Sequence, residues 1–566
     1  MKTRELFYIS AGKGGLTGVC LYLVCLFSAL EFVSGQEGNG APLSSAVAED
    51  PGLASSAVAE ADAALVEKPD DADTVYYIKD IIFDRTGKAV RTGLSWPYFL
   101  LRQGDMKIGE RITGRDNLEA YRLDKMQLLI NHRVLDRASI DLIFEEPEAD
   151  GSVPVILHVT TVDTATIIAL PQPRYDSNSG FRLVLKARDY NFLGTMNPLR
   201  VDLGYEWDSK KRESSFFALI DSDTPFRLFG YTWNFDFDHY FSYDPEAPFH
   251  YKNTTALSME LPVGFTTVTF GLAEALIVNE DSMAEYPDEF DESSKEFINP
   301  WVQEQEDNSR YKEFYMSTVL SASWKIPTKV HVGKFGELTY TPKIQEQWNY
   351  TPGGTIGYLR KGPAATLSHS LGFGRIDWID NFRDGVAASI SNSNTYNDYR
   401  KDWSSSLDVS VTGHVRIAQF FGVSGKLQYR DWFQDTYSKA GDSLRGIRDD
   451  DFSARRILSL NMDFPFRIFT FTPSIWFNKP GLRFLNLEFH LGPTVDAALV
   501  VEPGKSGISA DSIRAAAGIE FIAFSYFWRN LYLRLSGGLN LRQLIDSGSA
   551  PDPSVWEIFL GMEHHF

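Results

Sequence analysis

Cysteine is almost absent from this chain. Its 566 residues include only Cys20 and Cys25, and both lie within the first 35 positions. If that stretch is removed on export, the mature chain carries no thiol. Disulfide bonds, zinc–thiolate sites and cysteine nucleophiles are then excluded.

The N-terminus has the pattern of a secretion signal. Three basic residues in the first thirteen positions precede a mainly apolar run over residues 16–30, and Ser34 and Gly35 offer a cleavage site. We therefore predict that residues 1–35 are a signal peptide. An uncleaved helical anchor is the alternative, but the run is short for one and Glu31 interrupts it.

Positive charge and long hydrophobic runs are also scarce. The chain has 55 Lys and Arg against 75 Asp and Glu, a net charge of −20, which argues against a nucleic-acid partner. No segment after residue 35 reaches the roughly 18 uninterrupted apolar residues of a spanning helix. Much of the acidic excess lies in residues 280–307, which we expect to form a solvated extracellular loop.

Catalytic signatures are missing as well. No G-x-S-x-G, H-E-x-x-H, P-loop or dinucleotide-binding pattern occurs. His414 and His490 fall on predicted inward faces, but with ten histidines in the chain chance placement is the better interpretation. We therefore expect no enzymatic activity, no cofactor and no metal.

What the chain does have is alternation with a period of two. From residue 165 to the end, apolar residues alternate with polar ones, most clearly over residues 407–417, 199–208 and 485–492. The last segment, residues 556–566, alternates likewise and ends in a phenylalanine. Strands that are apolar on one face and charged on the other cannot form the water-free core of a β-sandwich, but they can form a wall between lipid and a water-filled lumen. We predict a mainly β protein with a transmembrane antiparallel barrel of about sixteen strands, an even number.

Two segments precede the predicted barrel at 165–566. Residues 36–74 are rich in Ala, Ser and acidic residues, which predicts a disordered or weakly helical linker. Residues 75–164 have the order β-α-α-β-β of one small α+β module. Its first helix is predicted to begin with Ser95 as the cap and Pro97 in the first turn.

Together these features resemble the outer-membrane barrel-assembly superfamily typified by BamA and TamA, in which periplasmic POTRA modules precede a sixteen-stranded barrel. The α+β module resembles one POTRA module, whereas family members usually carry two to five. The other matches, in order, are an early-strand motif at Asp189, Asn191 and Gly194, a loop tip at Leu444, Arg445, Gly446 and Ile447, a strand motif from Asn461 to Pro465, and a C-terminal strand signal at Gly561, His564 and Phe566.

The resemblance implies that the loop tip folds back into the lumen and that Arg445 is held there by an inward acid. The family places that acid in an F-x-D-x-G strand, where this chain has His490 in its place. Glu488, two residues away on the same face, and Asp463 are the other candidate partners of Arg445.

The resemblance also implies a function. Such a protein inserts and assembles outer-membrane proteins by strand addition at a lateral seam, with the lipid bilayer and unfolded client proteins as partners, and with periplasmic chaperones or accessory lipoproteins docking on the POTRA-like module. It would lie in the outer membrane of a diderm bacterium, with the module in the periplasm. Two alternatives remain open: a two-partner-secretion translocator that exports a partner protein, and a passive pore or surface antigen.

Removal of Phe566 is expected to impair the insertion of the protein itself, because recognition and closure would both use the last strand. Surface levels of the truncated chain, measured after cell fractionation, check this. Levels equal to those of the intact chain contradict the assignment of the C-terminal signal.

Overall fold

The structure is a computed structural model. It describes residues 72–566 apart from 86–94, 177–179, 209–212, 244–248, 279–288, 292–295, 299–313, 353–355, 357–359, 434–436, 438–439, 449–450, 506, 510–511, 547–555 and 562–566. The predicted signal peptide, almost all of the predicted linker, most of the acidic loop, His564 and Phe566 therefore lie outside the described residues.

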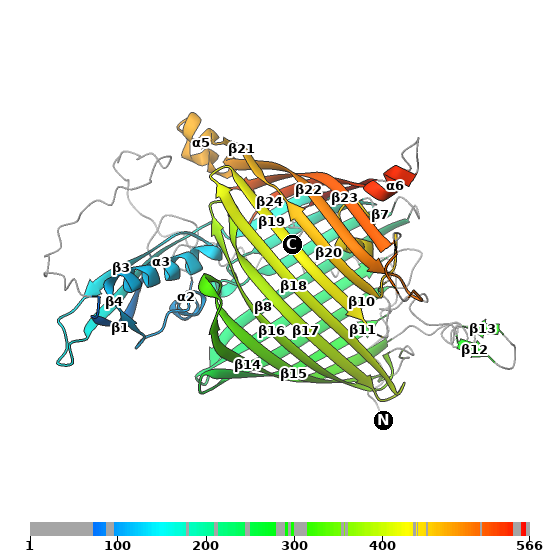
Figure 1. Cartoon of the computed structure of the whole chain (residues 1–566), viewed down its shortest axis with the longest axis horizontal. Coiled ribbons are helices and arrows are strands. Elements are labelled where there is room, and N and C mark those ends of the chain that lie inside the picture. Colours follow the sequence, from blue (N-terminus) through cyan, green and yellow to red (C-terminus); the bar gives the residue numbers. More distant parts are fainter. Residues whose placement is uncertain are drawn as a thin grey trace, which may run out of the picture. The chain divides into compact units, whose positions relative to one another are not determined.

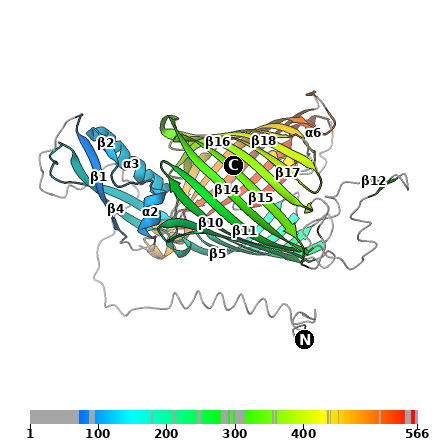
Figure 2. The same ribbon diagram turned by 90° about the horizontal axis from the view of Figure 1, so that it is seen from below.

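A closed antiparallel barrel makes up most of the described chain (Figure 1). Figure 2 shows strands β10 to β18 running side by side at a tilt along one wall. The barrel segments are β5 (Ile167–Asp176), β6 (Gly180–Asp189), β7 (Leu199–Asp208), β8 (Glu213–Leu228), β9 (Tyr231–Tyr243), β10 (His250–Val263), β11 (Thr266–Val278), β14 (Phe314–His331), β15 (Glu337–Tyr350), β16 (Pro363–Ile379), β17 (Phe382–Asn397), β18 (Asp402–Ala418), β19 (Phe421–Trp432), β20 (Arg456–Asp463), β21 (Phe466–Phe471), β22 (Leu487–Val501), β23 (Ile513–Ser525), β24 (Tyr532–Asn540) and β25 (Trp556–Gly561).

The described strands number eighteen. Nineteen segments close the ring, but β20 and β21 each pair with both β19 and β22, so they are two halves of one strand interrupted at Phe464 and Pro465. The predicted fold class is confirmed, and the even number is as expected, because an antiparallel ring closes only with an even count. The barrel has two strands more than the estimate of about sixteen.

The two faces of the wall differ as the alternation predicted. On β18, Val415 and Ile417 point outward with 47% and 61% of their surface exposed, whereas His414, the residue before Val415, points inward and is 5% exposed. Inward-facing charges pair across strands, as in Arg182–Glu206 at 2.5 Å and Arg430–Asp408 at 3.1 Å. An apolar outer face and a polar, charged inner face fit a barrel that spans a membrane. Within the described part of the chain, no helix combines the length and the apolar character that crossing a membrane requires.

The α+β module is a four-stranded sheet in the order β2-β1-β4-β3 with two helices. Its elements are β1 (Val75–Asp84), α2 (Pro97–Gln103), β2 (Arg111–Thr113), α3 (Arg115–Asn131), β3 (Leu135–Phe144) and β4 (Val153–Asp163). Alternate residues of β4 are fully buried against Leu118 and Leu129 of α3. The predicted order β-α-α-β-β therefore recurs with one addition, the three-residue strand β2.

The predicted cap of α2 is wrong. Pro97 does occupy the first turn, but the N-cap residue is Trp96, which makes no side-chain capping bond. The hydroxyl of Ser95 instead accepts a hydrogen bond from the side-chain amide of Asn191 at 3.0 Å. A contact between distant parts of the chain has replaced the local one.

Short elements complete the described chain: η1 (Phe192–Gly194), β12 (Glu289–Asp291), β13 (Glu296–Ile298), η3 (Gly333–Phe335), η5 (Ala440–Ser443), α5 (Pro473–Trp476), η6 (Pro480–Leu485) and α6 (Leu541–Asp546). The strand β5 begins directly after β4, so it starts at the end of the barrel next to the module. Successive strands alternate in direction, and the connections at this same end therefore include the β8–β9, β16–β17 and β23–β24 turns and residues 472–486. We call this the module end and the other the loop end.

Candidate functional site

The connection from β19 to β20 carries the predicted loop tip, and its described residues 440–448 lie inside the barrel. Leu444 and Ile447 of this tip are each 1% exposed. They belong to an apolar cluster inside the barrel whose other buried members are Ala440, Phe452, Ala454, Ile457, Ala498, Val500 and Ala516. The two apolar residues of the tip are thus packed against the wall rather than against solvent.

Arg445, between them, is held by carboxylates from three strands. Its backbone N–H and its Nε donate to one oxygen of Asp496 at 2.7 and 3.0 Å, and a terminal nitrogen donates to the other oxygen at 2.6 Å. The other terminal nitrogen donates to Asp463 and lies 3.8 Å from Glu520. Bidentate pairing of this kind suits the planar guanidinium and fixes its orientation as well as its position.

Burial makes this cluster costly to disrupt. Arg445 is 7% exposed, and Asp463 and Asp496 are 8% and 2% exposed. Removing one partner of a buried ion pair leaves uncompensated charge in a region from which water is largely excluded. Without the Arg445 guanidinium, Asp463 and Asp496 would repel each other, whereas Glu520 would keep Arg534 at 3.5 Å.

Gly446 brings the tip against the strands that follow. It has φ +84°, and a Cβ atom there would lie 2.7 Å from backbone atoms of Gly538 and Leu539, so only glycine fits. Its N–H donates to Glu557 of β25 at 2.7 Å. The tip therefore contacts the wall from β20 through to β25, the last described strand.

Of the three candidate partners of Arg445, one lies beside it and the other two lie elsewhere in the structure. Asp463 lies beside it, whereas Glu488 and His490 bond to each other at 2.7 Å. Glu488 also accepts a hydrogen bond from the Tyr526 hydroxyl at 2.5 Å. The residue that sequence reasoning missed is Asp496. A signal for it existed, because Asp496 is on the same inward face of β22 as Glu488, eight residues further along the strand.

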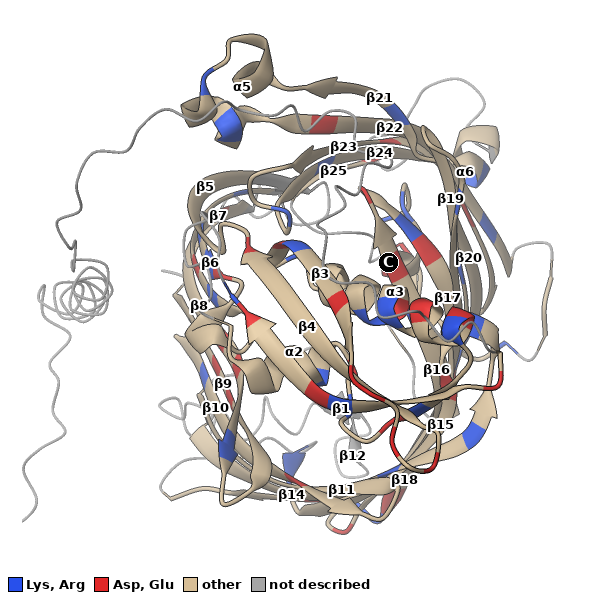
Figure 3. Ribbon diagram, turned by 90° about the vertical axis from the view of Figure 1, so that its left-hand side faces the viewer, with Lys and Arg blue, Asp and Glu red and all other residues tan. Residues whose placement is uncertain are grey.

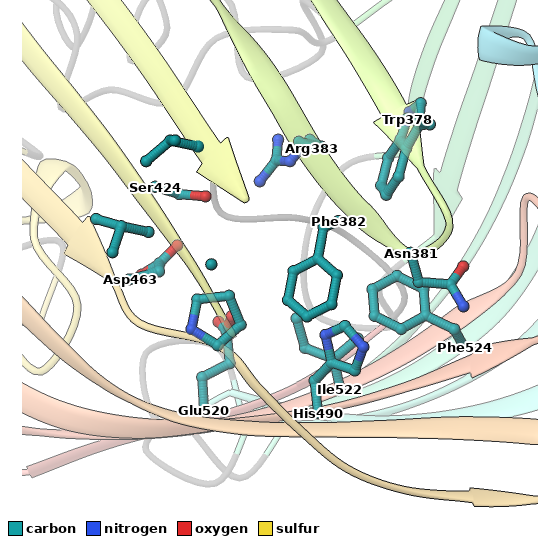
Figure 4. A pocket seen from close by; sticks show the side chains of 14 residues that line it. Trp378, Asn381, Phe382, Arg383, Ser424, Asp463, His490, Glu520, Ile522 and Phe524 are labelled. Atoms are coloured by element: carbon teal, nitrogen blue, oxygen red, sulfur yellow. The ribbon is translucent and has the colours of Figure 1, made fainter. Parts of the chain in front are cut away.

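A small cavity of about 40 Å³ lies next to this cluster on the side of the module end (Figure 4). Asp463 and Glu520 line it on one side, and Asn381 and Trp378 from the β16–β17 hairpin line the other. His490 projects into it with its ring 4.6 Å from that of Phe382. Among the described residues, no group of three or more His, Cys, Asp or Glu side chains is arranged to hold a metal ion.

The early-strand motif fastens the module to the barrel. Asn191, 1% exposed, donates to Ser95 and accepts from the backbone N–H of Met196 at 2.9 Å. The backbone carbonyl of Gly194 accepts from the N–H of Trp96 at 3.1 Å. Asp189 accepts from the N–H of Asn191 at 3.2 Å, which holds the turn in shape.

A second set of contacts joins α3 and the chain after it to the module end of the barrel. Asn131 donates to Asp377 at 2.8 Å and Gln127 donates to the carbonyl of Trp378 at 2.9 Å. Arg133 donates to Asn381 at 2.9 Å and stacks over the Trp378 ring at 4.3 Å. Burial lowers the pKa of the Arg133 guanidinium to about 9, so it still carries its charge at pH 7.

Of the C-terminal signal, only Gly561 is described. The ring of Phe559 lies over it, so a Cβ atom at Gly561 would come within 2.4 Å of that ring. Arg534 of β24 stacks on the same ring at 4.4 Å. Gly561 thus makes room for an inward aromatic residue beside the end of the ring of strands.

The structure is similar to several solved structures. CdiB from Acinetobacter baumannii is 13% identical, with 86% of this chain and 73% of that chain covered and a TM-score of 0.44. BamA from Haemophilus ducreyi, lacking POTRA domains 1–3, is 11% identical, with 86% and 84% covered and a TM-score of 0.37. CdiB from Escherichia coli is 10% identical, with 89% and 92% covered and a TM-score of 0.35. No family model and no curated protein matches the sequence.

Arg445→Ala is expected to destabilise the folded barrel by about 3–5 kcal/mol, because the buried Asp463 and Asp496 lose their shared counter-charge. Unfolding in urea, followed by heat-modifiable gel mobility, measures this. Arg200→Ala is the matched control, since its side chain is 52% exposed beside Asp221 and should change stability by only about 0–1 kcal/mol.

Adding Asp463→Asn and Asp496→Asn to Arg445→Ala should recover part of the loss, because the repulsion disappears. If Arg445→Ala unfolds at the same urea concentration as the parent protein, the cluster is not what holds the tip.

Proposed function

We propose that this protein is an outer-membrane barrel that inserts and assembles other outer-membrane proteins by strand addition at a lateral seam between β25 and β5. The observation that carries the proposal is the composition of the β5 edge. Two prolines, Pro171 and Pro173, lie in the middle of this strand. Proline has no N–H to donate, and within sheets it is confined to strand edges and bulges.

The direction in which these prolines face follows from the hydrogen-bond pattern. The N–H of Tyr190 donates to the carbonyl of Thr166, directly across from it, so residue 166 and every second residue after it bond toward β6. The odd-numbered residues bond the other way. The carbonyl of Ile167 does so, since it accepts from the Trp528 side chain in the β23–β24 turn at 3.2 Å. Pro171 and Pro173 therefore face β25.

The edge of β5 that faces β25 consequently has few backbone N–H donors. Of the five residues from 167 to 175 that face β25, two have no N–H. Each missing ladder bond removes about 1 kcal/mol of net stabilisation. The described residues of β25 pair with β5 at two positions, Phe559 with Asp176 and Leu560 with Tyr175. A strand pair with so few donors is suited to opening.

The two sides of the seam are restrained differently. On one side, Glu557 of β25 accepts from the loop tip, which is itself fixed by Arg445. On the other side, β5 is held near the module end, where Thr164 donates to the carbonyl of Phe527 at 2.8 Å and Trp528 donates to Ile167, and it pairs with β25 at Tyr175 and Asp176 near the loop end. Between these contacts lie Pro171 and Pro173, so the middle of β5 is where the fewest donors face β25. An unpaired strand edge is a template for an incoming strand.

Export through the lumen is the competing function. It requires passage past the loop tip and past the contacts of Arg133 and Asn131 at the module end, whereas seam insertion leaves both in place. Locking the seam therefore separates the two functions, since it blocks insertion and leaves a lumen route untouched.

A disulfide between Asp176→Cys and Phe559→Cys should abolish client insertion. These residues are opposite each other and fall at a non-hydrogen-bonded position, where Cα atoms are about 4.5 Å apart and a disulfide fits. The assay is the assembly of a reporter barrel in liposomes that contain the purified protein, with and without reductant. Ala256→Cys with Ala273→Cys, opposite each other on β10 and β11, is the control lock. Insertion at the parent rate in the oxidised seam variant overturns the proposal.

Pro171→Val with Pro173→Val should slow insertion by about tenfold or more, because two restored donors favour the closed seam by about 1 kcal/mol each. Pro262→Val, which changes an exposed proline of β10 far from the seam, is the matched control and should leave the rate unchanged. Equal rates for the double variant and the control would mean that seam opening does not limit the reaction.

A further inference from the structure

The connection between β21 and β22 is unlike the other turns at the module end. It spans residues 472–486 and contains α5 and η6, whereas the β8–β9 and β16–β17 turns have two residues each, Phe229-Gly230 and Asp380-Asn381. The segment is also internally bonded. The side-chain amide of Asn486 donates to the hydroxyl of Ser474 at 2.7 Å, and its oxygen accepts from the backbone N–H of Ser474 at 3.3 Å. We call residues 472–486 the β21–β22 hairpin.

This ordered hairpin leaves large apolar side chains uncovered. Five of its residues are more than a third exposed: Ile475 at 48%, Trp476 at 58%, Phe477 at 65%, Phe484 at 46% and Leu485 at 39%. Apolar surface left in water is unfavourable in proportion to its area. A gathering of this size within fifteen residues marks a surface that is covered by something else.

The charges of the hairpin have one sign. Lys479 and Arg483 are both exposed, and the fifteen residues include no aspartate or glutamate. In a chain with a net charge of −20 this composition is unusual. Aromatic residues beside Lys and Arg are the composition of segments that lie at a membrane–water interface.

The position of the hairpin points to the same environment. Seen from the module end, α5 stands outside the ring of strands rather than over the lumen (Figure 3). The outward-facing Phe471, at the end of β21, contacts the Trp476 ring at 5.1 Å. Next to it on the wall, Phe469 stacks on Phe489 at 4.5 Å, and Phe489 on Phe521 at 5.6 Å. The apolar surface of the hairpin is thus continuous with a lipid-facing band of aromatic rings.

We propose that the β21–β22 hairpin is an interfacial membrane anchor. Its apolar side chains enter the boundary between headgroups and acyl chains of the leaflet on the module side, and Lys479 and Arg483 bind lipid phosphates. The occupant of this surface is the bilayer rather than a protein, because the surface continues the wall that already faces lipid. The anchor does not depend on what the barrel does to client proteins.

A spin label placed at Gly481→Cys measures the depth of the hairpin. A Cβ atom at this exposed position meets no atom within 4 Å, so the label displaces nothing. The thiol is unique once Cys20 and Cys25 have been removed with the predicted signal peptide. The labelled mature protein is reconstituted into vesicles of phosphatidylcholine and phosphatidylglycerol. Collisions of the label with dissolved oxygen, which concentrates in lipid, are compared with collisions with a water-soluble nickel chelate.

Two reference positions bracket the result. Val411→Cys, 41% exposed near the middle of β18, reports the lipid-facing wall, and Ile108→Cys, 61% exposed in the module, reports water. The anchor predicts an oxygen-to-nickel collision ratio at Gly481→Cys that lies well above that of Ile108→Cys and below that of Val411→Cys. A ratio equal to that of Ile108→Cys places the hairpin in water, and low collision rates with both reagents indicate protein contact. Either outcome overturns the proposal.

Charge reversal tests the role of the basic residues. Lys479→Glu with Arg483→Glu should lower the collision ratio at Gly481→Cys in vesicles that contain phosphatidylglycerol, because anionic headgroups then repel the hairpin. Lys107→Glu with Arg137→Glu, which reverses two module side chains that are 71% and 79% exposed, is the matched control and should leave it unchanged. The same ratio for both double variants would exclude phosphate binding by Lys479 and Arg483.

Discussion

The pairing of one buried guanidinium with three acids is the interaction on which the inside of this barrel depends. Asp463, Asp496 and Glu520 come from β20, β22 and β23; Arg445 binds the two aspartates directly and shares Glu520 with Arg534, which lies 3.5 Å from it. By itself each acid would be costly to bury, and together they would force their strands apart. With Arg445 in place the loop tip is held, Gly446 reaches Gly538, and Glu557 of the last described strand gains a partner.

The parts of the structure that follow from local patterns were predictable from the sequence. The alternation of apolar and polar residues on β18 predicted which side chains face outward and which face the lumen. The positions of Leu118 and Leu129 in α3 predicted the side of that helix that is buried in the module. The number of strands did not follow from the alternation alone, because neighbouring short apolar segments can be separate strands or, like those on either side of Phe464-Pro465, two parts of one strand.

The parts that depend on distant contacts were not predictable in the same way. Ser95 has the composition of a helix cap, but Asn191, 96 residues away, bonds its hydroxyl. Asp496 could be assigned to the inward face, whereas its selection by Arg445 over Glu488 depends on how far the loop reaches into the lumen. Tyr526 and His490 already bond Glu488, which leaves Asp496 as the acid within reach.

The eighteen strands have a consequence for permeability. Barrels of eight strands are filled by their own side chains, whereas those of sixteen to eighteen leave an aqueous channel unless something occupies it. Here the inward loop with its apolar cluster, and the module residues bonded to the β16–β17 hairpin, stand in that space. The loop that joins the wall strands through Arg445 therefore also takes up part of the lumen, so the space left for a channel depends on where the loop tip lies.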